Sequence, residues 1–228
     1  MHTHPVLVLR LALVLLALVA SGCSHRLSKS TDSIAPEVPL SAAERGGALI
    51  YRSADSDSVQ FKSFHLPPAR IHRGEDSRFA DISEAEKAKL AARLRDSFAE
   101  TLAKGYPVVS TPAPDTLTLQ LTLVDVTTSV PVLSTALRAA SPISLAISAG
   151  QSAFGSSAAL TGAVRVAGEI YASDGRLVGA FIVSEHPLAI DLRSGLTKLY
   201  ATEIAIDQVA ANFKRAVDRS LAQKNAAR

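Results

Sequence analysis

The segment Thr116–Thr128 (TLTLQLTLVDVTT) constrains the fold more than any other part of this chain. Leucine occupies every second position from Leu117 to Leu123, and Thr or Gln fills the positions between. Successive side chains of a strand point to opposite faces, so this pattern predicts a strand with one buried and one polar face. Such a strand is typical of an antiparallel sheet that is covered on one side only.

Two amphipathic segments are suited to cover that side. Ser83-Glu84-Ala85-Glu86 has the form of a capping box, and apolar residues follow it at a spacing of four. Gly105 stands where a helix often ends in a left-handed residue. The segment Thr202–Gln223 is also predicted to be helical. The apolar residues that support the two helices are Leu90, Leu94, Phe98, Leu102, Ile206, Val209, Phe213, Val217 and Leu221.

Shorter segments complete the predicted sheet. Asp174-Gly175 is a two-residue signal for a tight hairpin, since Gly adopts positive φ at little cost. Ala48–Arg52 is predicted as a strand or a turn, and Ala69–His72 as an edge strand after Pro67-Pro68. The other predicted strands are Val59–Leu66, Tyr106–Ser110, Gly162–Ser173 and Arg176–Glu185. We expect an α+β fold: a mostly antiparallel four- or five-stranded sheet with two amphipathic helices on one face.

The first 22 residues have the features of an export signal. Met1–Arg10 carries one positive charge and no acid, and Leu11–Ala20 is uniformly apolar. Ten apolar residues are too few to cross a bilayer of about 30 Å as a helix. Small residues then precede Cys23, which is the only cysteine of the chain.

Ala20-Ser21-Gly22-Cys23 resembles the lipobox of bacterial lipoproteins, with Ala at the position where Leu is commonest. The resemblance implies cleavage before Cys23, a diacylglycerol on its sulfur and an acyl chain such as palmitate on its amino group. Three acyl chains would make the anchor effectively permanent. Ser24 follows, in place of the Asp that retains many lipoproteins in the inner membrane, so the resemblance favours the periplasmic face of the outer membrane.

The remaining sequence divides into a tether and one domain. Residues 23–45 comprise Cys23 and a polar, proline-containing segment, Ser24–Arg45, that we interpret as a flexible tether. Residues 46–228 are long enough for a single domain with a core of its own. Basic and acidic residues are interleaved along the chain, so its pI of about 9.1 indicates a solvated surface and no nucleic-acid partner.

The segment Val130–Thr161 does not fit a simple α+β domain. It contains a single charge, Arg138, and is rich in Ala, Ser and Gly. Structureless loops of this length are uncommon in compact domains. Three interpretations remain open: two short helices that cover the sheet, an apolar surface for an envelope protein or for self-association, and insertion into a bilayer by a multimer.

Neither catalytic nor metal-binding chemistry is indicated. The sequence lacks a G-x-S-x-G elbow, a phosphate-binding loop and clustered metal ligands, so we expect no catalytic residue, cofactor or metal. His65, His72 and His186 are interpreted as structural, with His65 and His72 near the surface. Asp125 interrupts an apolar run, and we interpret it as the point where the strand emerges into solvent.

The order of several short motifs resembles a family of small bacterial lipoproteins known as domain of unknown function number thirty-three thirteen. The resemblance extends from about residue 50 to residue 220 and implies an envelope lipoprotein with no described activity. The motifs that carry it are Val59–Arg73 with its F-x-x-F-H-x-P-P run, Tyr106-Pro107-Val108-Val109, Leu123-Val124-Asp125-Val126, Gly168-Glu169-Ile170 and Asp174-Gly175.

These observations favour an outer-membrane lipoprotein that acts as a non-enzymatic binding or assembly component of the cell envelope. Its expected partners are the membrane, through the lipid anchor, and an envelope protein or a second copy, through Val130–Thr161. Two alternatives remain. One is a self-oligomerising lipoprotein that inserts into the membrane, and the other is an envelope enzyme whose site forms only in three dimensions near Asp125, His65 or His186.

Overall fold

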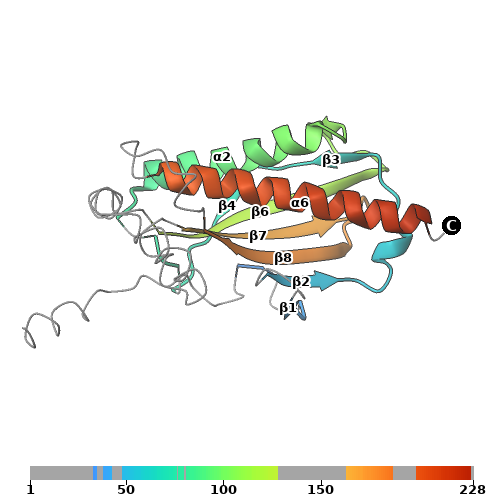
Figure 1. Cartoon of the computed structure of the whole chain (residues 1–228), viewed down its shortest axis with the longest axis horizontal. Coiled ribbons are helices and arrows are strands. Elements are labelled where there is room, and N and C mark those ends of the chain that lie inside the picture. The colour runs from blue at the N-terminus through green and yellow to red at the C-terminus, as the bar shows by residue number, and fades with distance from the viewer. Residues whose placement is uncertain are drawn as a thin grey trace, which may run out of the picture.

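The strand predicted from the alternating leucines, β6 (Thr116–Thr127), lies inside a sheet with two long helices on one side (Figure 1). The computed structural model describes residues 33–34, 38–42, 48–75, 77–79, 81–127, 163–186 and 199–226. The predicted signal peptide 1–22, Cys23 and Val130–Thr161 lie outside the described residues.

The sheet contains eight strands in its described part, in the order β1-β2-β8-β7-β6-β3-β5, with β4 also paired to β6. Antiparallel pairing joins β1, β2, β8, β7 and β6 in turn. The strands besides β6 are β1 (Ser41–Ala42), β2 (Leu49–Arg52), β3 (Ser63–His65), β4 (Arg70–Ile71), β5 (Val108–Val109), β7 (Ala163–Tyr171) and β8 (Leu177–Glu185).

The α+β class is confirmed, whereas the sheet has more strands than the four or five expected and is mixed. β3 and β4 both run parallel to β6, along the same edge of that strand. Parallel pairing arises because the chain crosses over through a helix between β4 and β6. Pro67-Pro68 separates β3 from β4, since proline has no N–H to donate to the strand ladder. The predicted strand Val59–Leu66 is shorter in the structure and spans Ser63–His65.

Helix α2 (Glu84–Ala103) begins at the predicted capping box. The Ser83 hydroxyl accepts a hydrogen bond from the Glu86 N–H at 3.3 Å, and the Ser83 N–H donates to the Glu86 carboxylate at 2.8 Å. The predicted left-handed C-cap at Gly105 is wrong. Lys104 caps the helix in a right-handed conformation, and Gly105 does not have positive φ. The second long helix, α6 (Tyr200–Ala226), matches the second predicted helix and extends beyond it.

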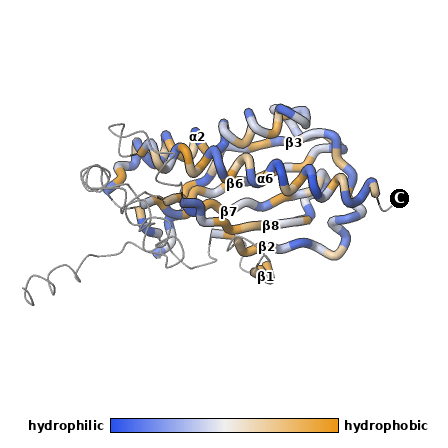
Figure 2. Tube along the Cα trace, in the orientation of Figure 1, coloured by the Kyte–Doolittle hydropathy of each residue, from blue (hydrophilic) through white to orange (hydrophobic). Residues whose placement is uncertain are grey.

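Both helices cover the leucine face of β6, as expected. Figure 2 shows hydrophilic and hydrophobic residues alternating along both helices, which is the pattern of helices with one buried side. The side chains that meet in this main core are fully buried. They include Leu90, Leu94, Phe98 and Leu102 of α2, Leu119, Leu121 and Leu123 of β6, and Ile206 of α6.

The hairpin predicted at Asp174-Gly175 is present between β7 and β8. Gly175 has φ of 83°, and its N–H donates to the carbonyl of Ala172 at 2.9 Å. The Ala172 N–H in turn donates to the Arg176 carbonyl at 2.9 Å. The loop therefore has three residues with the glycine in the left-handed position, one more than the sequence signal suggested.

The opposite face of the sheet has a small core of its own. Ile34 is buried there against Val124, Ala167, Ala180 and Ile182, and half-buried side chains surround this cluster. Residues 33–34 and 38–42 lie within the predicted tether Ser24–Arg45, yet they pack on the sheet and supply β1. The described part of that range thus belongs to the domain.

Gly168 allows the aromatic ring of Phe181 to lie flat on the neighbouring strand. A Cβ at this position would lie 2.3 Å from Cζ and 2.4 Å from Cε1 of Phe181. The ring has little room to move, because Phe213 of α6 packs against it with a centroid distance of 5.4 Å.

We predict that Gly168→Ala lowers the free energy of unfolding by about 1–3 kcal/mol, the usual cost of overpacking a core. Gly179→Ala is the matched control, since its nearest neighbour would be Ile170 Cδ1 at 3.4 Å, an ordinary contact. Urea denaturation followed by circular dichroism measures both changes. Equal stability of the two variants would show that the ring adapts freely.

Candidate functional site

The described sheet has one apolar face under the helices and a second face, without helices, that carries polar side chains beside the small apolar cluster around Ile34. We call the latter the helix-free face. Its polar side chains project from β4, β6 and β7 and form what we call the polar strip. The members of the polar strip are Arg70, Gln120, Thr122, Asp125, Arg165, Glu169 and Tyr171. Most of them are buried, which is unusual for charged residues and makes this strip the candidate site.

One half of the polar strip is centred on Glu169. Its side chain is 6% exposed, and its Oε2 atom lies 3.8 Å from Nη1 of Arg70, whose side chain is 66% exposed. Burial raises the pKa of the Tyr171 hydroxyl, and the charge of Glu169 and a hydrogen bond to it raise that pKa further. Arg70 acts in the opposite direction on the Tyr171 pKa. A buried carboxylate thus lies beneath an exposed guanidinium.

The side chain of Gln120 donates hydrogen bonds beside β6, where Pro67-Pro68 interrupts the strand pairing. Its side-chain amide nitrogen donates to the Pro68 carbonyl at 3.2 Å and to the Leu121 carbonyl at 3.1 Å. These bonds satisfy carbonyl groups at a point where proline interrupts the ladder between β6 and its parallel neighbours. Gln120 is therefore a structural member of the strip.

Asp125 marks the other end of the polar strip, and the expectation that it emerges into solvent is wrong. Its side chain is fully buried, and its Oδ1 atom accepts a hydrogen bond from the Arg78 N–H at 2.6 Å. The register between β6 and β7 shifts between Leu123 and Asp125, and Asp125 then pairs with Arg165. This bulge places Asp125 on the helix-free face, beside the buried Val124.

Of the histidines predicted near the site, His65 lies far from Asp125 along β6, whereas His72 lies close to it, directly after β4. Nδ1 of His65 lies 3.1 Å from the Val109 carbonyl, and His65 pairs with Thr118, seven residues before Asp125 on β6. Seven strand residues correspond to about 23 Å. His72 is half-buried and its backbone N–H donates to Leu123, whereas His186 is exposed just after β8. No group of three His, Cys, Asp or Glu residues in the described ranges could hold a metal ion.

A comparison with protein families identifies the group of proteins to which this architecture belongs. The family model described as "Protein of unknown function (DUF3313)" matches residues 38–213. The chain belongs to this family. The match begins at Val38, within the N-terminal segment that packs on the helix-free face.

Other comparisons add little to the family assignment. No curated protein matches the chain. A PelC dodecamer from Paraburkholderia phytofirmans is 10% identical with a TM-score of 0.39, over 72% of this chain and 95% of that one. A point variant of the same dodecamer is 11% identical with a TM-score of 0.37, over 76% and 93% of the two chains.

The helices of this family member carry polar contacts of their own. Nη2 of Arg93 on α2 lies 2.7 Å from each carboxylate oxygen of Asp207 on α6, and the Ser97 hydroxyl donates to the same carboxylate at 2.7 Å. The Tyr106 hydroxyl donates to Asp218 at 2.6 Å. Burial raises the pKa of Tyr106 to about 12, with the bond to Asp218 as the second cause. These contacts join the helices to each other and to the segment before β5.

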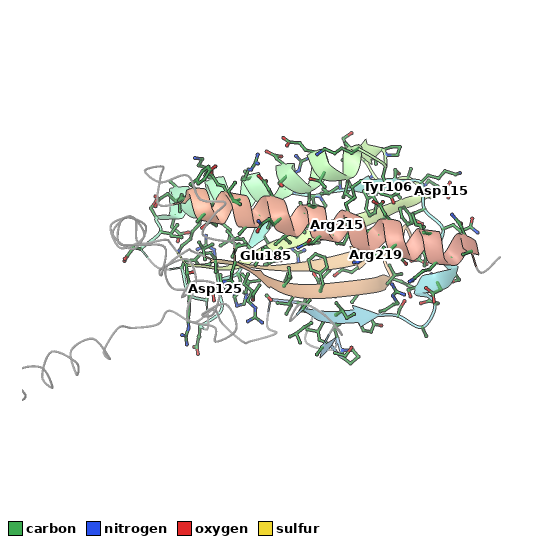
Figure 3. The ribbon with its side chains drawn as sticks, in the orientation of Figure 1. Tyr106, Asp115, Asp125, Glu185, Arg215 and Arg219 are labelled. Atoms are coloured by element: carbon green, nitrogen blue, oxygen red, sulfur yellow. The ribbon has the colours of Figure 1, made fainter. Side chains whose placement is uncertain are left out.

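Glu185 lies where β8 ends beneath α6. Its Oε2 atom accepts a hydrogen bond from the Asn212 side chain at 3.3 Å, and Asn212 also contacts Arg215. Burial raises the pKa of Glu185, while the Asn212 bond and the charge of Arg215 lower it. Figure 3 shows Glu185 beside α6 and Asp125 at the far end of the domain from Tyr106. The ionisable groups are thus distributed over the fold.

From the sequence, we did not predict Arg70, Arg165, Glu169 or Tyr171 as site residues. A signal for two of them was present, because Arg165 and Glu169 interrupt the apolar strand AVRVAGEIY as Asp125 interrupts β6. Their alignment across β6 and β7 could not be predicted, since it depends on the strand register. The predicted lipidation residue Cys23 lies outside the described residues.

We predict that Asp125→Ala lowers the free energy of unfolding by about 1.5–3 kcal/mol, because it removes a buried hydrogen bond to a charged group. Asp115→Ala is the control, since Asp115 is 54% exposed and forms a surface ion pair with Lys62. Such a pair contributes about 0–1 kcal/mol. Urea denaturation at pH 7 measures both. If Asp125→Ala costs no more than Asp115→Ala, Asp125 does not stabilise the fold.

Proposed function

We propose that this protein is a lipoprotein of the outer membrane that faces the periplasm and binds or assembles envelope components without catalysing a reaction. The observation that carries the proposal is the sequence Ala20-Ser21-Gly22-Cys23 after an apolar segment, with no second cysteine in the chain. A single thiol in an exported protein has no disulfide partner within its own chain. Lipidation at Cys23 gives this thiol a function.

The arrangement of ionisable side chains supports a non-enzymatic function. Catalysis needs an acid, base or nucleophile within hydrogen-bond reach of a reacting group. In the described part of the chain, Asp125 accepts a bond from the Arg78 backbone, and His65 is about 23 Å from it by strand spacing. Glu185 is bound to Asn212 on the other side of the sheet. These contacts are of the kind that stabilise a fold.

The segment Val130–Thr161 is the part of the chain that we propose as the partner surface. The strands on either side of it are paired where it leaves and returns, since Thr127 of β6 lies opposite Ala163 of β7. Both ends of the segment therefore start from the same end of the sheet. Its proposed partner is an envelope protein, and self-association is the alternative.

Metabolic labelling with an alkyne analogue of palmitate tests the anchor. We predict that the wild-type protein incorporates the label and sediments with the outer membrane. Cys23→Ala is expected to lose both properties, because the acyl chains have no attachment point. Label incorporation into Cys23→Ala, or none into the wild type, would contradict the proposal.

Affinity purification from detergent-solubilised envelopes tests the binding function. We predict that one envelope protein co-purifies in near-equal amount with the tagged, lipidated protein and is lost when residues 130–161 are replaced by a short Gly-Ser loop. A circular dichroism spectrum and a urea midpoint close to those of the wild type are the control for folding. Co-purification that survives the replacement would contradict the assigned surface. If no other protein co-purifies and the purified protein has a multiple of its monomer mass, self-association is favoured.

A further inference from the structure

The N-terminal segment joins the domain on its helix-free face. Ile34 is 6% exposed and packs against Val124 of β6 and Ala167 of β7. It also contacts the cluster formed by Ala180 and Ile182 of β8, so it lies over the middle strands of the sheet. Val38 and Leu40 extend the packing toward β1. The chain that leads to Cys23 therefore departs from the face that the helices leave uncovered.

Little chain remains between this contact and Cys23. From Cys23 to Ser33 is ten residues. Ten residues reach at most about 33–36 Å when fully extended. A flexible chain of this length has a root-mean-square span of about 17 Å. The domain itself is longer than that, since α6 alone, with 27 residues, extends for about 40 Å.

We propose that the helix-free face is turned toward the phospholipid head groups of the anchoring membrane, with α2 and α6 directed away from it. This inference rests on the proposed lipidation of Cys23. The opposite orientation would require the chain to pass from Ile34 around the β1 edge and over α6. That path crosses about three strand spacings and the thickness of the sheet and helix layers, roughly 35 Å. Nearly full extension of the ten residues would be needed.

The charge on this face is compatible with head groups. Arg70 is 66% exposed there, while its partner Glu169 is 6% exposed beneath it. The charge that reaches the surface at this point is therefore the guanidinium. Arginine binds phosphate oxygens through its planar set of N–H donors. Arg70 is accordingly suited to contact the phosphate groups of a phospholipid surface.

Fluorescence energy transfer from the domain to a lipid-borne acceptor tests this orientation. Full-length lipidated protein would be reconstituted in phosphatidylethanolamine–phosphatidylglycerol vesicles that carry an acceptor on their head groups. The donor is attached at Arg70→Cys on the helix-free face or at Lys89→Cys on the exposed side of α2. These variants are matched, because each replaces an exposed cation that forms one long ion pair, at 3.8 Å with Glu169 or 3.5 Å with Glu203. The lipidated Cys23 has no free thiol to react.

We expect a larger loss of donor fluorescence at position 70 than at position 89. Insertion of about 20 Gly and Ser residues between Cys23 and Ser33 should reduce the difference, since it adds a flexible span of about 25 Å. Equal transfer in the original protein, or greater transfer at position 89, would overturn the orientation. Palmitate labelling of the same preparations separates the two proposals. If the protein does not incorporate the palmitate label, the proposed lipid anchor is wrong. If it is labelled but transfer at position 70 does not exceed that at position 89, only the proposed orientation is wrong.

Discussion

The burial of one face of β6 against two helices is the constraint on which the rest of this structure depends. Leu119, Leu121 and Leu123 are fully buried, and α2 and α6 supply the apolar side chains opposite them. Side chains alternate between the two faces of a strand, so a register shift of one residue would expose this set. The positions of β7, β3 and β4 follow, because each pairs directly with β6.

The other face of the same strand explains why the N-terminal segment belongs to the domain. Val124, Ala167 and Ile182 form a small apolar cluster on a face that otherwise carries polar side chains. Ile34 covers this cluster and removes its apolar surface from water. A segment whose composition resembles a linker thus becomes part of the sheet packing. Its proximity to Cys23 then connects the geometry of the sheet with the proposed position of the domain on a membrane.

Charged groups within the sheet are retained through specific contacts. A buried carboxylate is costly unless it is paired or accepts hydrogen bonds, and Asp125 meets this requirement through the Arg78 backbone. Glu169 lies beneath Arg70 and beside Tyr171. Such contacts orient the loops and strands that carry these groups.

Local sequence patterns determined the long elements of this protein and indicated β2, β4 and β5, whereas only the tertiary structure decided how these short strands pair and which side chains form the polar strip. The capping box at Ser83, the leucines of β6 and Gly175 act through neighbouring residues, so their effects are visible in the sequence. The two-residue strands β1, β4 and β5 exist because other strands pair with them. The burial of Asp125 likewise depends on a bulge against β7, which lies far away in the chain. The hydrophobic periodicity of a segment shows which of its faces is apolar, whereas the strand register shows which distant segments pair. A single sequence contains the periodicity directly but not the register.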